Sequence, residues 1–138
     1  MQASRISYPI DLLQTIAAER DLEPSMELKT IRIQALSLPE VTEVPHFNYA
    51  SFRVRGKLFI TVPPDEAHAH LFVGEQDREA ALAMYPGFIE KLMWGTRVAG
   101  LRVTLAKAKP SVVADLVRKA WHNKAPKRLA ATVAERVP

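Results

Sequence analysis

Residues 51–62 read SFRVRGKLFITV, and this stretch decides the fold of the chain. Apolar residues alternate with others on both sides of Arg55-Gly56. Because successive side chains of a strand face opposite ways, the pattern predicts two strands joined by a tight turn at that pair. One predicted face is apolar and consists of Phe52, Val54, Leu58, Ile60 and Val62. The other is basic with one aromatic ring, should meet solvent, and consists of Arg53, Arg55, Lys57, Phe59 and Thr61.

The composition of the 138-residue chain is that of a globular domain, with 48% hydrophobic and 25% charged residues. The absence of cysteine excludes disulfides, thiolate catalysis and Cys-ligated metal or iron–sulfur centres. No apolar run approaches the roughly 18 residues needed to cross a membrane, and Met1–Arg5 lack the apolar stretch of a signal peptide. We therefore expect a cytoplasmic protein with no membrane partner.

The positive charge is concentrated near the C-terminus. From Ala106 onward the chain has eight Lys or Arg residues and two Asp or Glu residues, whereas the preceding part has 11 and 13. Such an asymmetry indicates an anionic partner such as nucleic acid, although a solvated basic helix face gives the same pattern.

The periodicity of the remaining sequence predicts alternating groups of helices and strands. Helices are expected at 9–20, 25–37 and 76–84, from Pro110 to the break at Pro126, and at 125–137, with Ser25 as a candidate cap of the second. Strands are expected at 49–55, 57–62, 67–73, 96–98 and 101–105. Residues 38–49 look like an extended connection, and 88–93 fit either a strand or a helix. With short connections and no repeated strand–helix crossovers, the order predicts an α+β two-layer sandwich with an antiparallel sheet.

Several of these segments resemble the MmcQ/YjbR family. They are LPEVTE at 38–43, HF at 46–47, SFRVRGKLF at 51–59, GLRVTL at 100–105, the helix over 111–121, and AW…APK ending at 127. The resemblance implies a YjbR-like two-layer fold likened to type III secretion chaperones, a proposed double-wing DNA-binding motif, and no catalytic residues. The implied organisation is an N-terminal helical extension over 1–24 and an MmcQ/YjbR-like domain over 25–138.

The outward sheet face is the first candidate site. Its members are Arg53, Arg55, Lys57, Phe59, Thr61, His68, His70, Phe72, Arg102 and Thr104. Cations neutralise phosphates and exposed rings stack on bases, so this combination favours nucleic acid. The alternative is that Phe59 and Phe72 are covered by a helix, or form an interface with a second copy or another protein. A third reading is a small anionic ligand bound at Arg53, Arg55 and Arg102.

A second candidate is the basic C-terminal segment, which contains Lys107, Lys109, Arg118, Lys119, Lys124, Lys127 and Arg128. These side chains could contact phosphates beside the sheet, but cations near a helix C-terminus also stabilise the helix without any partner. Trp121 falls on the apolar stripe of its helix, which predicts a core position.

Other chemistry has little support in the sequence. His68 and His70 share one strand face, which is only half of a metal site, and spacing places no third ligand among Asp65, Glu66 and His46. No nucleophile elbow, Walker loop or dinucleotide fingerprint is present. We therefore expect a non-catalytic protein without a metal or cofactor that binds DNA through basic residues.

Overall fold

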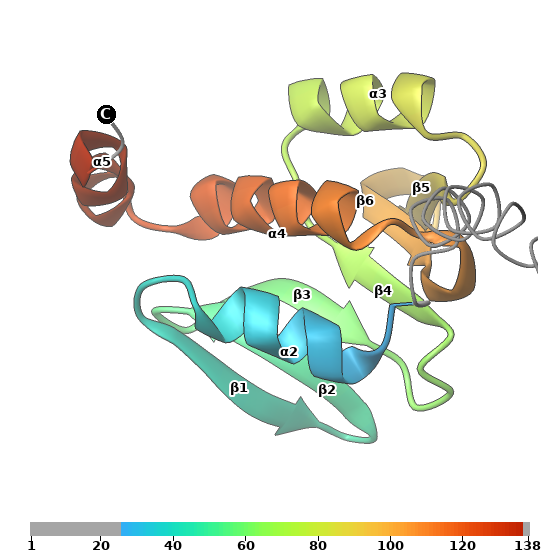
Figure 1. Cartoon of the computed structure of the whole chain (residues 1–138), viewed down its shortest axis with the longest axis horizontal. Helices are drawn as coiled ribbons and strands as arrows, with labels where there is room; N and C mark the ends of the chain where they lie inside the picture. Colours follow the sequence, from blue (N-terminus) through green and yellow to red (C-terminus); the bar gives the residue numbers. More distant parts are fainter. Residues whose placement is uncertain (1–25, 137–138) are drawn as a thin grey trace, which may run out of the picture.

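The computed structural model describes residues 26–136 (Figure 1). Its strands are β1 (Val41–His46), β2 (Tyr49–Val54), β3 (Lys57–Val62), β4 (His68–Leu71), β5 (Ile89–Trp94) and β6 (Arg97–Thr104). Its helices are α2 (Leu28–Leu36), α3 (Glu75–Met84), α4 (Pro110–Lys124) and α5 (Lys127–Arg136), with a 3-10 turn, η1, at Leu105–Lys107. The helix expected at 9–20, the Ser25 cap and the extension over 1–24 lie outside the described residues.

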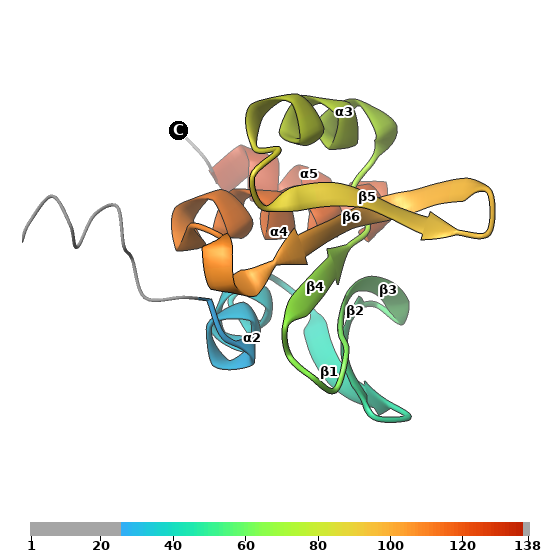
Figure 2. The same ribbon diagram turned by 90° about the vertical axis from the view of Figure 1, so that its right-hand side faces the viewer.

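The six strands form one sheet in the order β1-β2-β3-β4-β6-β5, and every neighbouring pair is antiparallel. Helix α4 contacts β3, β4 and α2, while α2 also packs on β1. Helix α3 packs on the β5–β6 hairpin at the other end of the sheet, as Figure 2 shows. This arrangement confirms the predicted α+β fold with an antiparallel sheet.

The turn at Arg55-Gly56 forms as the sequence predicts. Both residues have positive φ, +48° and +82°, which is the requirement of the two-residue hairpin turn whose twist matches that of the flanking strands. Val54 pairs with Lys57 directly across it. The bounds of β3 are those predicted, and β2 ends one residue earlier than expected.

A β-bulge changes which side chains of β3 face the core. Phe52 pairs with Ile60 and Arg53 with Leu58, so Phe59 is an extra residue in β3. The strict alternation predicted from sequence is therefore wrong here. Phe59 turns inward beside Ile60 and is 0% exposed, whereas Leu58 shares the outer side with Arg53 and is only half-buried.

Two other regions differ from the sequence-based expectation. Residues 38–49 contain β1, an edge strand, which explains why Pro45 is tolerated there: an edge strand has one side free of ladder hydrogen bonds. The two strands expected at 96–98 and 101–105 form one continuous strand, β6, which includes Gly100. A Cβ at Gly100 would lie 2.4 Å from the carbonyl oxygen of Leu71, so the close approach of β4 requires glycine.

The core lies between the sheet and α4. The predicted apolar stripe of α4 is buried, and Trp121 is 0% exposed, which confirms its predicted core position. The indole Nε1 of Trp121 donates a hydrogen bond of 3.0 Å to the carbonyl oxygen of Pro39, which joins α4 to the segment before β1. Within residues 26–136, no helix has the length and apolar character that crossing a membrane requires.

Candidate nucleic-acid interface

Two of the four Arg and Lys side chains of the predicted basic face, Arg55 and Arg102, are paired with carboxylates. At the hairpin turn, Arg55 donates from Nε and Nη2 to the two carboxylate oxygens of Glu40, at 2.7 and 3.1 Å. This paired hydrogen bond raises the pKa of Arg55 and lowers the pKa of Glu40. Arg53 donates to the carbonyl oxygen of Gly56 at 3.2 Å and so stays close to its own hairpin. Neither arginine extends freely towards a ligand.

The histidines lie in a hollow of about 530 Å³ on the outer face of the sheet. Arg102 donates to Glu90 Oε1 at 3.0 Å and lies 3.3 Å from His68 Nδ1, while His70 Nδ1 lies 3.2 Å from Thr61 Oγ1. Burial, and after it the charge of Arg102, lowers the pKa of His70, which favours the neutral form of the ring. The hollow therefore brings His68, His70 and Arg102 of the predicted face together, and its lining also includes one further cation, Lys91, and one carboxylate, Asp65.

The surroundings of His68 and His70 in this hollow can be compared with what a metal site would need. His68 and His70 already have the polar neighbours Arg102 and Thr61. Among the residues that the structure describes, no group of three or more His, Asp or Glu side chains is placed to hold a metal ion.

The two predicted stacking rings are both buried. The prediction that Phe59 lies on the outer face is wrong, because the bulge in β3 directs it into the core. Phe72 is 5% exposed and follows directly after β4. Its amide donates to the carbonyl oxygen of Phe59 at 3.1 Å, and its own carbonyl oxygen accepts from Asn123 Nδ2 at 2.8 Å. These bonds position Phe72 between β3 and the end of α4, where it forms the floor of a cleft.

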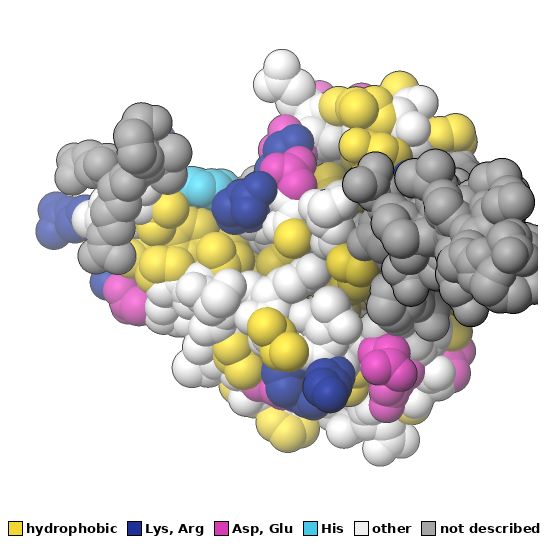
Figure 3. Space-filling model, in the orientation of Figure 1, with side chains coloured by type: hydrophobic (Ala, Val, Ile, Leu, Met, Phe, Trp, Pro, Cys, Tyr) yellow, Lys and Arg dark blue, Asp and Glu magenta, His cyan; other side chains and the backbone are white. Residues whose placement is uncertain are grey.

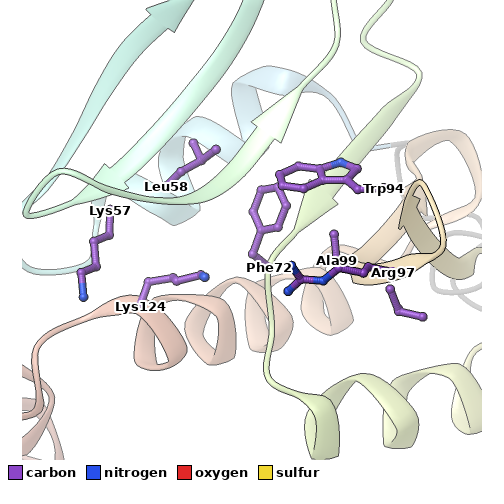
Figure 4. A pocket seen from close by; sticks show the side chains of 8 residues that line it. Lys57, Leu58, Phe72, Trp94, Arg97, Ala99 and Lys124 are labelled. Carbon is purple, nitrogen blue, oxygen red and sulfur yellow. The ribbon is translucent and has the colours of Figure 1, made fainter.

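This cleft has a volume of about 640 Å³ and lies between the β2–β3 and β5–β6 hairpins (Figure 4). Its lining comes from the start of β3, the residue after β4, both strands of the β5–β6 hairpin and the last residue of α4. The lining residues are Lys57, Leu58, Phe72, Trp94, Arg97, Val98, Ala99 and Lys124. We call it the hairpin cleft. It combines an apolar floor with three cations.

The charges of the hairpin cleft all have one sign. Among the described residues that line it, Lys57, Arg97 and Lys124 are cationic and none is acidic. None of these three makes a salt bridge to another described residue. Figure 4 shows Lys124 and Arg97 extending towards each other from opposite sides of the cleft. The site is thus ready to accept an anion.

Trp94 supplies the exposed ring that Phe59 does not. It is 59% exposed, and its ring centroid lies 5.4 Å from that of Phe72 with the planes tilted by 59°. The sequence pattern assigns no role to Trp94 or Arg97. The signal present in the sequence is a large aromatic residue directly before a turn glycine; Gly95 has φ +64°.

The C-terminal cations do not form one surface. Arg118 and Lys119 pair with Asp115 at 2.9 and 3.0 Å. Lys107 and Lys109 precede α4, about 20 Å from Lys124 at a rise of about 1.5 Å per residue. Lys127 and Arg128 belong to α5, where Arg128 lines a separate hollow with Glu40 and Leu129. On the helical side of the molecule, Lys and Arg side chains are scattered (Figure 3). Of this predicted set, Lys124 alone lines the hairpin cleft.

Comparison with known proteins agrees with this fold. The YjbR family model matches residues 36–123. The crystal structure of Deinococcus radiodurans protein DR2400, whose domain is assigned to DUF419, is similar with a TM-score of 0.63 and 15% sequence identity. The similarity covers 82% of this chain and 91% of that one. No curated protein matches the chain. The family match extends over more than half of the sequence, and the chain therefore belongs to the YjbR family.

Proposed function

We propose that this YjbR protein binds nucleic acid, with DNA as its ligand, and that it does so without catalysing a reaction. The phosphates bind at the hairpin cleft. The observation that supports this proposal is a set of three cations around an open cleft, Lys57, Arg97 and Lys124, which have no acidic partner among residues 26–136. The cytoplasmic location predicted from the sequence belongs to the same proposal.

The physical basis is counterion release. A cation that neutralises a backbone phosphate displaces a condensed counterion from the nucleic acid. The entropy gained by the released counterions supplies most of the affinity of sequence-independent binding. Arg55 and Arg102 contribute little to it, because each already has a carboxylate partner. The two hairpins that flank the cleft are natural candidates for the two wings of the DNA-binding motif proposed for the family.

The alternatives considered from the sequence have less support. An interface built on Phe59 and Phe72 would need exposed rings, and these rings are 0% and 5% exposed. A small-anion site at Arg53, Arg55 and Arg102 would need free guanidinium groups, and the last two are ion-paired. In the hairpin cleft, by contrast, the ring of Trp94 is exposed and the three cations make no salt bridge to a described residue.

The salt dependence of binding tests the proposal. Fluorescence anisotropy with a short labelled duplex and its single strand should show log affinity falling linearly with log salt, with a slope of about 0.9 per phosphate contact for duplex and about 0.7 for a strand. Lys124→Gln should lower that slope by about one contact. Lys29→Gln, an exposed position on α2 outside the cleft, should leave it unchanged. Absent binding, or equal slopes for both variants, would contradict the proposal.

A further inference from the structure

The geometry points to single-stranded nucleic acid as the ligand of the hairpin cleft: an unpaired base stacks on Trp94 while Lys57, Arg97 and Lys124 bind the phosphates on either side of it. This inference rests on the proposed function and narrows it to one class of ligand. It goes beyond the predicted double-wing reading, which concerns DNA in general and includes no role for Trp94.

The first step is the exposure of Trp94. The chain has two tryptophans: Trp121 is 0% exposed in the core, and Trp94 is 59% exposed at the end of β5. An indole at this position adds little to stability, because most of its surface remains in water. Its exposed face is a platform of the kind on which nucleobases stack without regard to sequence.

The second step is that the platform is held in place before a ligand arrives. Phe72 supports Trp94 from the floor of the cleft, with ring centroids 5.4 Å apart. Phe72 is itself fixed by its backbone bonds to Phe59 and Asn123. A ring that is already ordered loses little conformational entropy on binding, so more of the stacking energy appears as affinity.

The third step is the position of the cations relative to the ring. Arg97 pairs with Trp94 across the β5–β6 ladder, so both side chains lie on the same face of the hairpin. Lys57 and Lys124 line the opposite side of the cleft (Figure 4). A base stacked on Trp94 therefore has cations on both sides, which can bind the two phosphates that join its nucleotide to its neighbours in the strand.

The fourth step distinguishes a single strand from a duplex. The cleft volume of about 640 Å³ is within the roughly 300–1,000 Å³ typical of pockets that enclose small organic groups. It therefore accepts a nucleotide from a strand. In a duplex, each base ring within the helix is stacked between neighbouring base pairs. No face of such a base is free to stack on Trp94, so a duplex contacts only the cations at the rim of the cleft.

Titrating the full chain with an oligothymidylate strand, and with the same strand annealed to oligoadenylate, tests the inference. The strand should quench the fluorescence of Trp94, leave the buried Trp121 emission, and bind at least about tenfold more tightly than the duplex at equal salt. Trp94→Ala should weaken strand binding roughly 5- to 140-fold, the equivalent of about 1–3 kcal/mol per stacked base, and leave duplex binding nearly unchanged. Trp94→Phe should retain most of the strand affinity.

Met84→Ala is the matched control, because Met84 is an apolar side chain on α3 that is 66% exposed and lies outside the cleft. It should leave strand binding unchanged. Equal affinity for strand and duplex, with no effect of Trp94→Ala, would overturn this inference and leave the proposed function standing. Thymidine monophosphate binding as tightly as the strand would also overturn it, since the site would then be a nucleotide pocket. Binding of neither strand nor duplex would overturn both proposals.

Discussion

Reversing two charges of the hairpin cleft, in the variant Lys57→Glu/Lys124→Glu, should weaken nucleic-acid binding by about 100-fold or more at roughly 0.1 M salt. Each lost phosphate contact lowers the duplex affinity about eightfold at that concentration. The reason is that this affinity falls with the salt concentration raised to a power of about 0.9 for every contact. The new carboxylates add repulsion. The measurement is fluorescence anisotropy at fixed salt, with the labelled strand and the labelled duplex titrated separately.

The control for this variant must change the net charge equally. Lys29→Glu/Lys107→Glu does so at two exposed positions, one on α2 and one in η1, that do not line the cleft. We expect this control to weaken binding by only a few-fold, through the general field of the protein. Equal losses in the two double variants would mean that net charge, and not the cleft, determines binding.

The second large effect concerns stability. Phe59→Ala should lower the free energy of unfolding by about 3–5 kcal/mol, because it removes a fully buried aromatic ring and leaves a cavity in the core. Leu58→Ala, at the neighbouring half-buried position, should cost much less. Urea unfolding followed by circular dichroism measures both. If Phe59→Ala is too unstable to purify, Phe59→Leu should still show a measurable loss.

Strict strand alternation predicts the reverse order for these two positions, since it places Leu58 in the core and Phe59 in solvent. A larger loss for Leu58→Ala than for Phe59→Ala would therefore refute the bulge in β3. The comparison is informative because the two residues are adjacent, belong to the same strand and differ in the face that they present.

Local patterns in the sequence were sufficient for much of the fold. The turn at Arg55-Gly56 follows from two residues, and the burial of Trp121 follows from the apolar stripe of one helix. The bulge at Phe59 could not be predicted in this way, because a bulge depends on how two strands pair. The sequence of β3 taken alone shows a regular alternation. Strand β1 was missed for a related reason: it is a half-exposed edge strand that contains Pro45.

The candidate site shows the same limit. Charge and aromatic character single out Lys57 and Phe72 on the predicted sheet face, and Lys124 in the C-terminal segment, as parts of two separate surfaces. The structure brings them together with Trp94 and Arg97, which come from a hairpin far along the chain. Ion pairs also form only when distant parts of the chain fold onto one another. The sequence does not reveal that Glu40 neutralises Arg55, whose partner lies 15 positions away.

The central claim is that nucleic acid occupies the hairpin cleft, and mapping backbone and indole N–H chemical shifts during titration with a single strand tests it most directly. We predict the largest changes at the indole of Trp94 and at the amides of Lys57, Arg97 and Lys124. The indole of Trp121, buried in the core, should not change. Changes centred instead on His68, His70 and Arg102 in the outer hollow, or no changes at all, would contradict the claim.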